Sequence, residues 1–263
     1  MAAPRIPSAD AVASPSTSPD GVAALDRAFA ILFAFRPEDK GLSLADLANR
    51  TGLYKSTILR LIASLTHHRM LLRSDDGRYY VGPAALQLGA LYQRGLQLSD
   101  VVLPLMTMLR DLSGESVSFY VRQGNLRVCL YRVDSTHAIR DHVREGDVLP
   151  MDKGSGGRVL TAFSGARGAL YDRIRKDAYY ISVGERDEET AGISTPVFSA
   201  DQLAGAFTLA GPRSRVDEAL MLKMRKPMIE ASIEASEKLG GDSAVLHAAL
   251  TAQKPGKTRI KMR

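Results

Sequence analysis

Apolar residues in the first third of the chain recur at the spacing of amphipathic helices. Two segments, 22–35 and 54–68, each carry four of them at i, i+3, i+4 and i+7: Leu25, Ala28, Phe29 and Leu32 in the first, and Ile58, Leu61, Ile62 and Leu65 in the second. Residues at this spacing lie on one side of a helix. Each segment is therefore predicted to be a helix whose apolar side faces a core.

Signals for a further helix and a tight turn lie between these two segments. Ser43 followed by Asp46 has the spacing of a capping box, which predicts a helix that starts after Ser43. Gly52 then precedes the 54–68 helix, and a glycine there allows the positive φ of a sharp turn. The order helix, tight turn, helix predicts a helix-turn-helix.

The stretch from Met70 to Val81 has the pattern of a β-hairpin. Met70–Arg73 and Arg78–Val81 contain β-favouring residues, and Ser74–Gly77 between them ends in Asp-Gly, which is a strong turn signal. A hairpin directly after a helix-turn-helix is a wing. The first part of the chain is therefore predicted to be a winged helix-turn-helix.

The side of the 54–68 helix opposite its apolar face is small and polar, which suits contact with DNA. A helix N-terminus attracts phosphate, small side chains allow close approach to base edges, and arginine bonds to guanine or to phosphate oxygens. The predicted DNA-binding residues on this helix and near the ends of the wing are Lys55, Ser56, Thr57, Arg60, Arg73 and Arg78. The alternative is that they are ordinary solvated surface residues.

Two more helices are predicted after the wing. Pro83 suits the first position of a helix that runs to residue 95, and Ser99-Asp100 opens another one. One side of the second helix is expected to carry Val101, Leu105, Met108 and Leu112. Pro104 is expected to kink or restart this helix unless it lies within the first turn.

The remaining sequence alternates between strand-like and helical patterns. Strands are predicted at 115–121, 126–133, 138–143, 179–183, 193–198 and 203–210, and helical stretches at 157–171 and 215–239. Gln123-Gly124-Asn125 separates the first two strands as a turn, so these strands are expected to pair antiparallel. The predicted fold class is α+β, with a C-terminal domain built around a mostly antiparallel sheet.

The composition shows that the chain is basic, and it predicts a tail at each end. The 263 residues carry a formal net charge of +6, and residues 21–82 hold nine Lys or Arg against six Asp or Glu, which is compatible with nucleic-acid binding without being specific for it. No run approaches the roughly 20 apolar residues of a membrane span, so no membrane partner is expected. The predicted division is a disordered tail at 1–20, the winged helix-turn-helix at 21–83, a linker helix at 84–99, an effector-binding or oligomerisation domain at 100–250 and a basic tail at 251–263.

Residue types that support catalysis do not form a known arrangement here. His137 and His142 lack helical i, i+4 spacing, the lone Cys129 has no evident local base, and no Gly-x-Ser-x-Gly elbow occurs. The acidic run at 185–189 is more typical of a solvated loop than of a metal cage. We therefore expect no enzyme, no cofactor and no metal site, and the single thiol fits a reducing cytoplasm.

A glycine-rich segment, Lys153–Arg158, precedes a predicted helix and is a candidate anion site. Backbone N–H groups at a helix start can point at a carboxylate, and Arg158 could add positive charge. The segment lacks the Gly-Lys-Ser/Thr ending of a nucleotide P-loop. A helix start without a ligand is the alternative interpretation.

Three segments of the N-terminal part resemble, in order and spacing, the DNA-binding domain of the IclR family, named for the isocitrate lyase regulator. They are residues 24–28, 41–48 and 52–62, and the likeness continues through 79–82 and, more loosely, to about residue 239. The resemblance implies a dimer that reads a pseudo-palindromic operator. It also implies a C-terminal domain similar to GAF folds, with an effector pocket on one side of the sheet.

Carrying the family's small-molecule site onto this chain by position implies a set of effector-binding residues. They are Ser155, Gly156, Ser182, Gly192, Thr208 and Ala210. Ser182 stands where the family has an acid, Gly192 where it has a thiol and Ala210 where it has a hydroxyl, while Asp152-Lys153 replaces a frequent His-Ala pair. The interval 165–178 is also shorter than the helical excursion common in the family, which implies a reduced pocket wall. The family's effector therefore does not carry over.

These patterns together predict a cytoplasmic transcriptional regulator, a repressor or an activator, that is a homodimer or homotetramer. Its predicted partners are double-stranded operator DNA and a small-molecule effector, an organic or aromatic acid. The alternative is a DNA-binding dimer whose C-terminal domain only oligomerises and binds no ligand.

Overall fold

A computed structural model describes residues 21–252, except 37, 96–97 and 201. The tail predicted at 1–20, and all but two residues of the one predicted at 251–263, lie outside the described residues. The chain forms two compact units, one ending at Tyr92 and the next starting at Gln93. Each unit has its own buried apolar clusters and is described here by itself.

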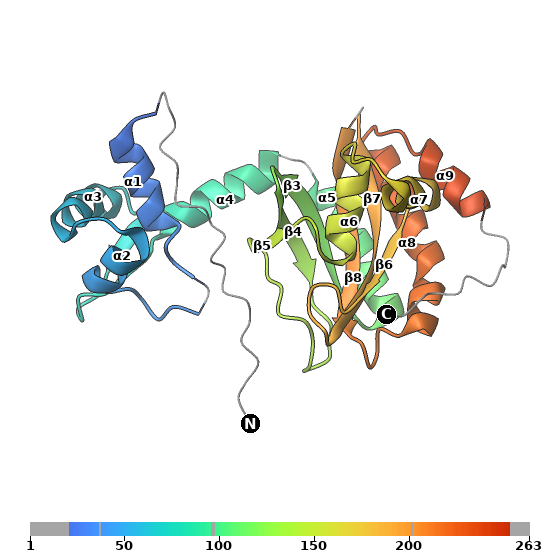
Figure 1. The fold of residues 1–263 in the computed structure, drawn as a ribbon, viewed down its shortest axis with the longest axis horizontal. Coiled ribbons are helices and arrows are strands. Elements are labelled where there is room, and N and C mark those ends of the chain that lie inside the picture. The colour runs from blue at the N-terminus through green and yellow to red at the C-terminus, as the bar shows by residue number, and fades with distance from the viewer. Residues whose placement is uncertain (1–20, 37, 96–97, 201, 253–263) are drawn as a thin grey trace. The chain divides into compact units, whose positions relative to one another are not determined.

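The N-terminal unit consists of helices followed by a small hairpin (Figure 1). Its elements are α1 (Ala23–Leu32), α2 (Leu44–Thr51), α3 (Lys55–His67), β1 (Leu71–Arg73), β2 (Tyr79–Val81) and α4 (Pro83–Gly95), whose last residues belong to the second unit. The centre of this unit is apolar, with Ile31, Leu47, Ile58 and Leu71 all fully buried. Helix α4 starts at Pro83, as predicted.

Helix α2 begins with the predicted capping box and ends at the predicted turn. Ser43 Oγ accepts a hydrogen bond from the Asp46 N–H at 3.2 Å, and Asp46 Oδ2 accepts one from the Ser43 N–H at 2.9 Å. Gly52 has a φ of 69° and closes the helix through its N–H to the Ala48 carbonyl. The helix-turn-helix is therefore confirmed, and α3 follows this turn directly.

The wing also forms as predicted. Leu71–Arg73 and Tyr79–Val81 pair antiparallel, with Leu71 opposite Val81. Gly77 takes a φ of 79° at the turn. Leu42 adds a short bridge to Tyr79, which ties the hairpin to the segment before α2.

The predicted core face of α1 is wrong in part, because Leu32 packs against the core cluster as predicted but Leu25 and Phe29 do not. Leu25 is 54% exposed and Phe29 is 46% exposed, whereas Ile31 is fully buried. The helix itself carries apolar residues around most of its circumference, so the periodicity is compatible with more than one buried face. Packing against α3 selects the face that contains Ile31 and leaves the other apolar stripe uncovered in the single chain.

The C-terminal unit is a six-stranded antiparallel sheet covered by helices on both faces (Figure 1). Its strands lie in the order β5-β4-β3-β8-β7-β6. They span β3 (Ser116–Gln123), β4 (Leu126–Val133), β5 (Val148–Pro150), β6 (Tyr180–Val183), β7 (Thr190–Ser199) and β8 (Gln202–Pro212). The helices are α5 (Ser99–Ser113), α6 (Gly154–Phe163), α7 (Ala169–Asp177), α8 (Glu218–Lys238) and α9 (Ala244–Thr251).

The two faces of this sheet bury different apolar clusters. Helices α5 and α8 cover one face, where Phe119, Phe207 and Leu209 meet Met106 and Met224. Helix α6 covers the other face, with α7 packed beside it. This arrangement confirms the predicted α+β class with an antiparallel sheet. Within the described residues, no helix combines the length and apolarity needed to span a bilayer.

Several boundaries in this unit differ from the prediction. Residues 138–143 form no strand, and the short β5 pairs with β4 instead. The stretch predicted as one helix at 157–171 is two helices, α6 and α7. Helix α5 runs through Pro104, and its buried residues are Val102, Leu105, Met106 and Leu109. Leu105 was predicted to face this way, whereas Met108 and Leu112 of the predicted side are 39% and 51% exposed.

The capping box at the start of α2 yields a stability prediction. Ser43→Ala removes the hydroxyl that satisfies the Asp46 N–H, so the free energy of unfolding of the N-terminal unit should fall by about 1 kcal/mol. Ser64→Ala on the exposed side of α3 is the control and should change it by less than about 0.5 kcal/mol. Urea unfolding followed by circular dichroism measures both. Equal stabilities of the two variants would show that the box contributes nothing.

Candidate nucleic-acid interface and ligand recess

The polar face of α3 consists of Lys55, Ser56, Thr57 and Arg60, opposite the buried Ile58 and Ile62. Lys55, Ser56 and Arg60 are exposed and Thr57 is half-buried. Among the described residues, no side chain caps the start of α3. Its first backbone N–H groups are therefore available to an anion such as a phosphate.

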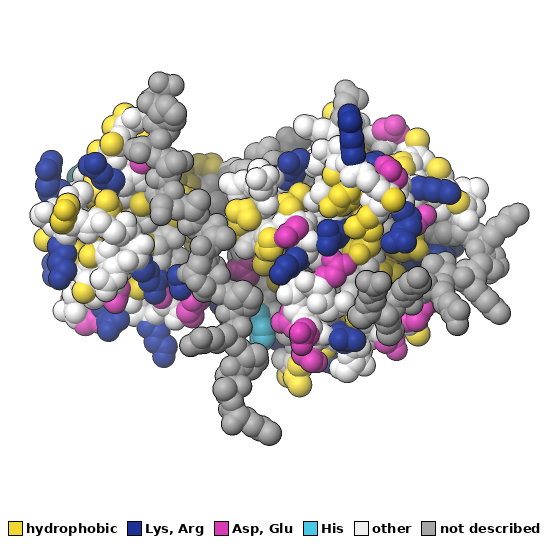
Figure 2. Space-filling model, in the orientation of Figure 1, with side chains coloured by type: hydrophobic (Ala, Val, Ile, Leu, Met, Phe, Trp, Pro, Cys, Tyr) yellow, Lys and Arg dark blue, Asp and Glu magenta, His cyan; other side chains and the backbone are white. Residues whose placement is uncertain are grey.

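The wing arginines are exposed but already have contacts within the chain. Arg73 lies over the Tyr79 ring at 5.9 Å, and Arg78 donates to the Gly41 carbonyl at 3.2 Å. Arg78 also pairs with Asp76 at 3.6 Å. These contacts hold both guanidinium groups near the hairpin, and further Lys and Arg side chains are spread over the visible face of the same unit (Figure 2).

Tyr54 belongs to this surface although the sequence patterns did not select it. It immediately precedes α3 and is 84% exposed. An aromatic residue at such a position is expected to pack inward, so its exposure is the unusual feature. Its apolar ring and polar hydroxyl lie beside Lys55, where they extend the surface available for contact.

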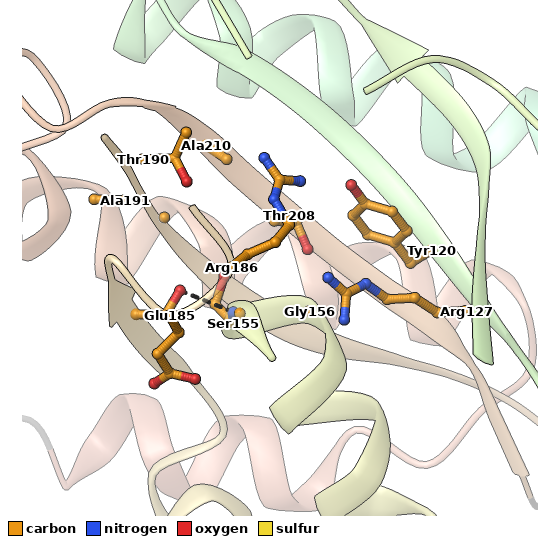
Figure 3. A pocket seen from close by; sticks show the side chains of 13 residues that line it. Tyr120, Arg127, Ser155, Gly156, Glu185, Arg186, Thr190, Ala191, Thr208 and Ala210 are labelled. Carbon is orange, nitrogen blue, oxygen red and sulfur yellow. Dashed lines mark hydrogen bonds between the residues drawn. The ribbon is translucent and has the colours of Figure 1, made fainter. Parts of the chain in front are cut away.

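The six residues carried over from the family site all line one hollow in the C-terminal unit. This recess lies between the start of α6 and strands β3, β4, β6, β7 and β8, and it holds about 370 Å³, including the part open to solvent (Figure 3). Ser155 and Gly156 come from α6, Ser182 from β6, Gly192 from β7, and Thr208 and Ala210 from β8. Positions more than 50 residues apart thus meet at one place.

Helix α6 approaches the sheet closely because its first residues are small. Gly154, Ser155, Gly156 and Gly157 are all buried. A Cβ on Gly156 would lie 2.8 Å from Thr208 Oγ1 and 3.2 Å from the Tyr120 ring. The glycines therefore allow the positive end of this helix to lie against the recess.

A chain of hydroxyl groups connects α6 to three strands beneath the recess. Ser194 Oγ donates to Ser155 Oγ at 2.8 Å and lies 2.7 Å from Thr208 Oγ1. The Ser155 N–H donates to Ser182 Oγ at 2.9 Å. Ser194 is fully buried and was not predicted from the sequence, because a serine in a central strand carries no distinguishing signal.

Arg127 of β4 is the main recess residue that the sequence analysis missed. Its side chain is buried, and Nη1 donates to the Lys153 carbonyl at 2.8 Å and to the Pro150 carbonyl. Burial lowers the pKa of Arg127 to about 10, so it remains protonated at neutral pH. Arg127 shares the face of β4 that holds the buried Cys129, but this alternation alone does not tell a buried strand arginine from a solvated one.

Arg158, predicted to add charge to the anion site, is engaged elsewhere. Its Nε lies 3.2 Å from Glu185 Oε2, and Tyr180 donates its hydroxyl to Glu185 Oε1 at 2.6 Å. Arg158 is not among the residues lining the recess, whereas Arg186 is. The expected contribution of Arg158 is therefore corrected in favour of Arg127 and Arg186.

The shortened interval at 165–178 still contains a helix. Helix α7 fills it, with Ile174 buried in the same cluster as α6, and Arg175 Nη1 donates to the Ala166 carbonyl at 2.7 Å. Of the described residues that line the recess, none lies on α7. Helix α7 therefore packs beside α6 without forming a wall of the recess.

The thiol of Cys129 and the possible metal-binding side chains do not form a reactive site. Burial raises the pKa of the Cys129 thiol to about 12, so it stays protonated and unreactive. Across the described ranges, no cluster of three His, Cys, Asp or Glu side chains could hold a metal ion.

Comparison with known proteins shows similarity to one family of regulators along most of the chain. Residues 24–75 match the IclR helix-turn-helix domain, and residues 90–169 match the C-terminal domain of the bacterial transcriptional regulator IclR. The chain is 24% identical over 235 residues to the HTH-type transcriptional regulator KipR of Bacillus subtilis, covering 80% of this chain and 93% of KipR. It is 25% identical over 244 residues to BhcR of Paracoccus denitrificans, covering 82% and 87%.

A solved structure shares the fold. It is an IclR homolog from Microbacterium hydrocarbonoxydans, crystallised with 4-hydroxybenzoate, with a TM-score of 0.71 and 22% identity over 82% of this chain and 98% of that one. The named relatives are transcriptional regulators rather than enzymes.

The close contact at the start of α6 yields a second stability prediction. A Cβ on Gly157 would lie 2.2 Å from Arg127 Nη1 and 2.4 Å from the Met151 carbonyl oxygen. Gly157→Ala should therefore lower the free energy of unfolding of the C-terminal unit by about 1–3 kcal/mol, despite the better helix propensity of alanine. Gly89→Ala in α4, where nothing lies within 4 Å, is the control. Urea unfolding measures both variants, and a free energy of unfolding for Gly157→Ala equal to that of the parent chain would contradict this packing.

Proposed function

Because the chain belongs to the IclR family of bacterial transcriptional regulators, we propose that it binds duplex operator DNA and that a small organic acid in the recess changes its affinity for that operator. One observation carries this proposal. The same chain joins a winged helix-turn-helix with an exposed polar face on α3 to a second unit with a buried polar recess. A protein that binds operator DNA acts in the cytoplasm, so we propose a cytoplasmic location.

The DNA contact is assigned to α3 and the wing. Lys55, Ser56 and Thr57 lie in the first turn of α3, where side chains and free N–H groups contact phosphates. Arg60, one turn further on and exposed, reaches a base edge in the major groove. Arg73 and Arg78 contact phosphates or the minor groove on either side of the wing.

The effector contact is assigned to the recess. Ser155 and Gly156 bind through the start of α6, while Ser182 and Thr208 supply hydroxyl groups and Gly192 and Ala210 leave room for the ligand. The 4-hydroxybenzoate bound by the Microbacterium homolog supports an aromatic or other small acid as the ligand class. Effector and DNA are then coupled through differential affinity of two conformations.

The proposed oligomer is a homodimer or homotetramer that binds a pseudo-palindromic operator. The N-terminal unit exposes apolar stripes that a partner subunit would cover. They are Val22, Leu25, Phe29 and Phe33 in and next to α1, and Leu86, Leu88 and Leu91 in α4.

Binding to DNA is tested by fluorescence titration of duplexes from the region preceding the coding sequence, at several salt concentrations. The association constant should fall steeply as salt rises, because phosphate contacts release counterions. Arg60→Ala should lose about 1–3 kcal/mol and relax the preference at one base pair, whereas Lys55→Ala should weaken all duplexes similarly.

The control for this titration is Arg173→Ala, which alters an exposed residue on α7 and should bind DNA like the parent chain. Salt-insensitive binding, or full affinity in both the Arg60 and the Lys55 variants, would show that α3 is not the DNA-binding surface.

Effector binding is tested by a thermal-shift screen of small carboxylates that includes 4-hydroxybenzoate. A ligand that binds only the folded protein at 100 times its Kd stabilises it by about 2.7 kcal/mol, so Tm must rise. A screen without any stabilising acid would favour the rival function, in which the C-terminal unit only joins subunits.

A further inference from the structure

Arg127 is a buried positive charge without a carboxylate partner in the described part of the chain. The residue is 2% exposed, and none of the ion pairs formed by the buried arginines of this unit includes it. Its Nη1 is satisfied by two backbone carbonyls, but Nε is buried and has no hydrogen-bond partner among the described residues. An uncompensated buried ion is costly, so such a group is normally paired.

Most other poorly exposed arginines of the C-terminal unit have carboxylate partners, and the half-buried Arg225 of α8 lies over the Tyr179 ring instead. Arg132 pairs with Asp134 at 2.7 Å and with Asp141, and Arg158 pairs with Glu185 at 3.2 Å. Arg215 pairs with the buried Glu115. Of the arginines in the described ranges, Arg127 is the only one that is fully buried, and it lines the recess without a carboxylate partner.

The charge of Asp152 attracts Arg127, but Asp152 is exposed and does not line the recess, where the neighbours of Arg127 add positive potential. Its side chain points toward Gly156 at the start of α6, whose helix dipole is positive at that end (Figure 3). Arg186 also lines the recess and is close enough to oppose the charge of Arg127. Asp141 is 3.5 Å from Arg186 but is shared with Arg132, and the Glu185 carboxylate is held by Arg158 and Tyr180.

Small and aromatic groups surround this positive centre. The Tyr120 ring lies 5.1 Å from the Arg127 guanidinium, and Gly192 and Ala210 present little side chain. A carboxylate placed here would meet Arg127 and the N–H groups of α6, with the Tyr120 ring beside it.

We propose that Arg127 is the specificity-determining residue of the recess, which binds the carboxylate of the effector and excludes neutral and cationic analogues. This inference rests on the proposed effector function and deepens it. The carboxylate oxygens accept charge-assisted hydrogen bonds from the guanidinium, including the unpartnered Nε–H. The ligand thus supplies the counter-charge that the chain itself omits.

The test uses sodium formate, because the smallest carboxylate fits any carboxylate subsite whatever the natural effector is. Replacing 100 mM sodium chloride by 100 mM sodium formate should raise the Tm of the C-terminal unit of the full chain by roughly 2–4 °C. Arg127→Met should abolish this difference. Arg122→Met, which removes an exposed arginine of β3 outside the recess, should retain it.

Arg127→Lys keeps the charge but loses the planar donor pair, so it should show a reduced formate response, and it serves if the methionine variant does not fold. Benzoate and benzamide provide a matched pair on the unaltered chain, where only benzoate should raise Tm. Equal responses to formate and chloride, or a formate response that survives in both Arg127 variants, would overturn the proposal.

The same samples separate this inference from the proposed function. A formate response that depends on Arg127, combined with duplex affinity that no carboxylate changes, would keep the anion site and reject effector control. Normal DNA binding without an Arg127-dependent response would reject the anion site and leave operator binding standing.

Discussion

A guanidinium removed from water must find acceptors and a counter-charge, and this requirement at Arg127 shapes the C-terminal unit. Two backbone carbonyls, of Pro150 and Lys153, bend toward Arg127 Nη1 and thereby fix the loop that leads into α6. Gly157 must lack a side chain because a Cβ would overlap this guanidinium. The start of α6 is consequently held against the sheet, with its positive end toward the recess.

The hydroxyl network explains how an occupant of the recess can act on more than one element. Ser194 joins Ser155 on α6 to Thr208 on β8, and Ser182 on β6 accepts from the Ser155 backbone. A ligand that replaced or strengthened these bonds would act on α6 and the three strands together. Effector control in the proposed function therefore requires only a small shift of a hydrogen-bonded unit rather than a new fold.

Local signals predicted the DNA-binding unit well, because each one has a direct backbone cause. The Ser43–Asp46 pair caps a helix, Gly52 takes the left-handed conformation, and Gly77 turns the wing. The face of α1 was not predictable, since periodicity cannot choose between two apolar stripes, of which the one that contains Ile31 packs against the core cluster. The six recess residues followed from family resemblance, whereas Arg127 was missed because a strand arginine has the same pattern whether it is solvated or buried.

The coupling between recess and operator is the central claim, and one titration measures it directly. The Kd for an operator duplex would be determined with and without a saturating carboxylate, in the parent chain and in Arg127→Met. The account predicts a change of about 5-fold to 150-fold in the parent chain, the usual range of allosteric coupling, and none in the variant. A Kd that the bound carboxylate leaves unchanged in the parent chain would contradict it.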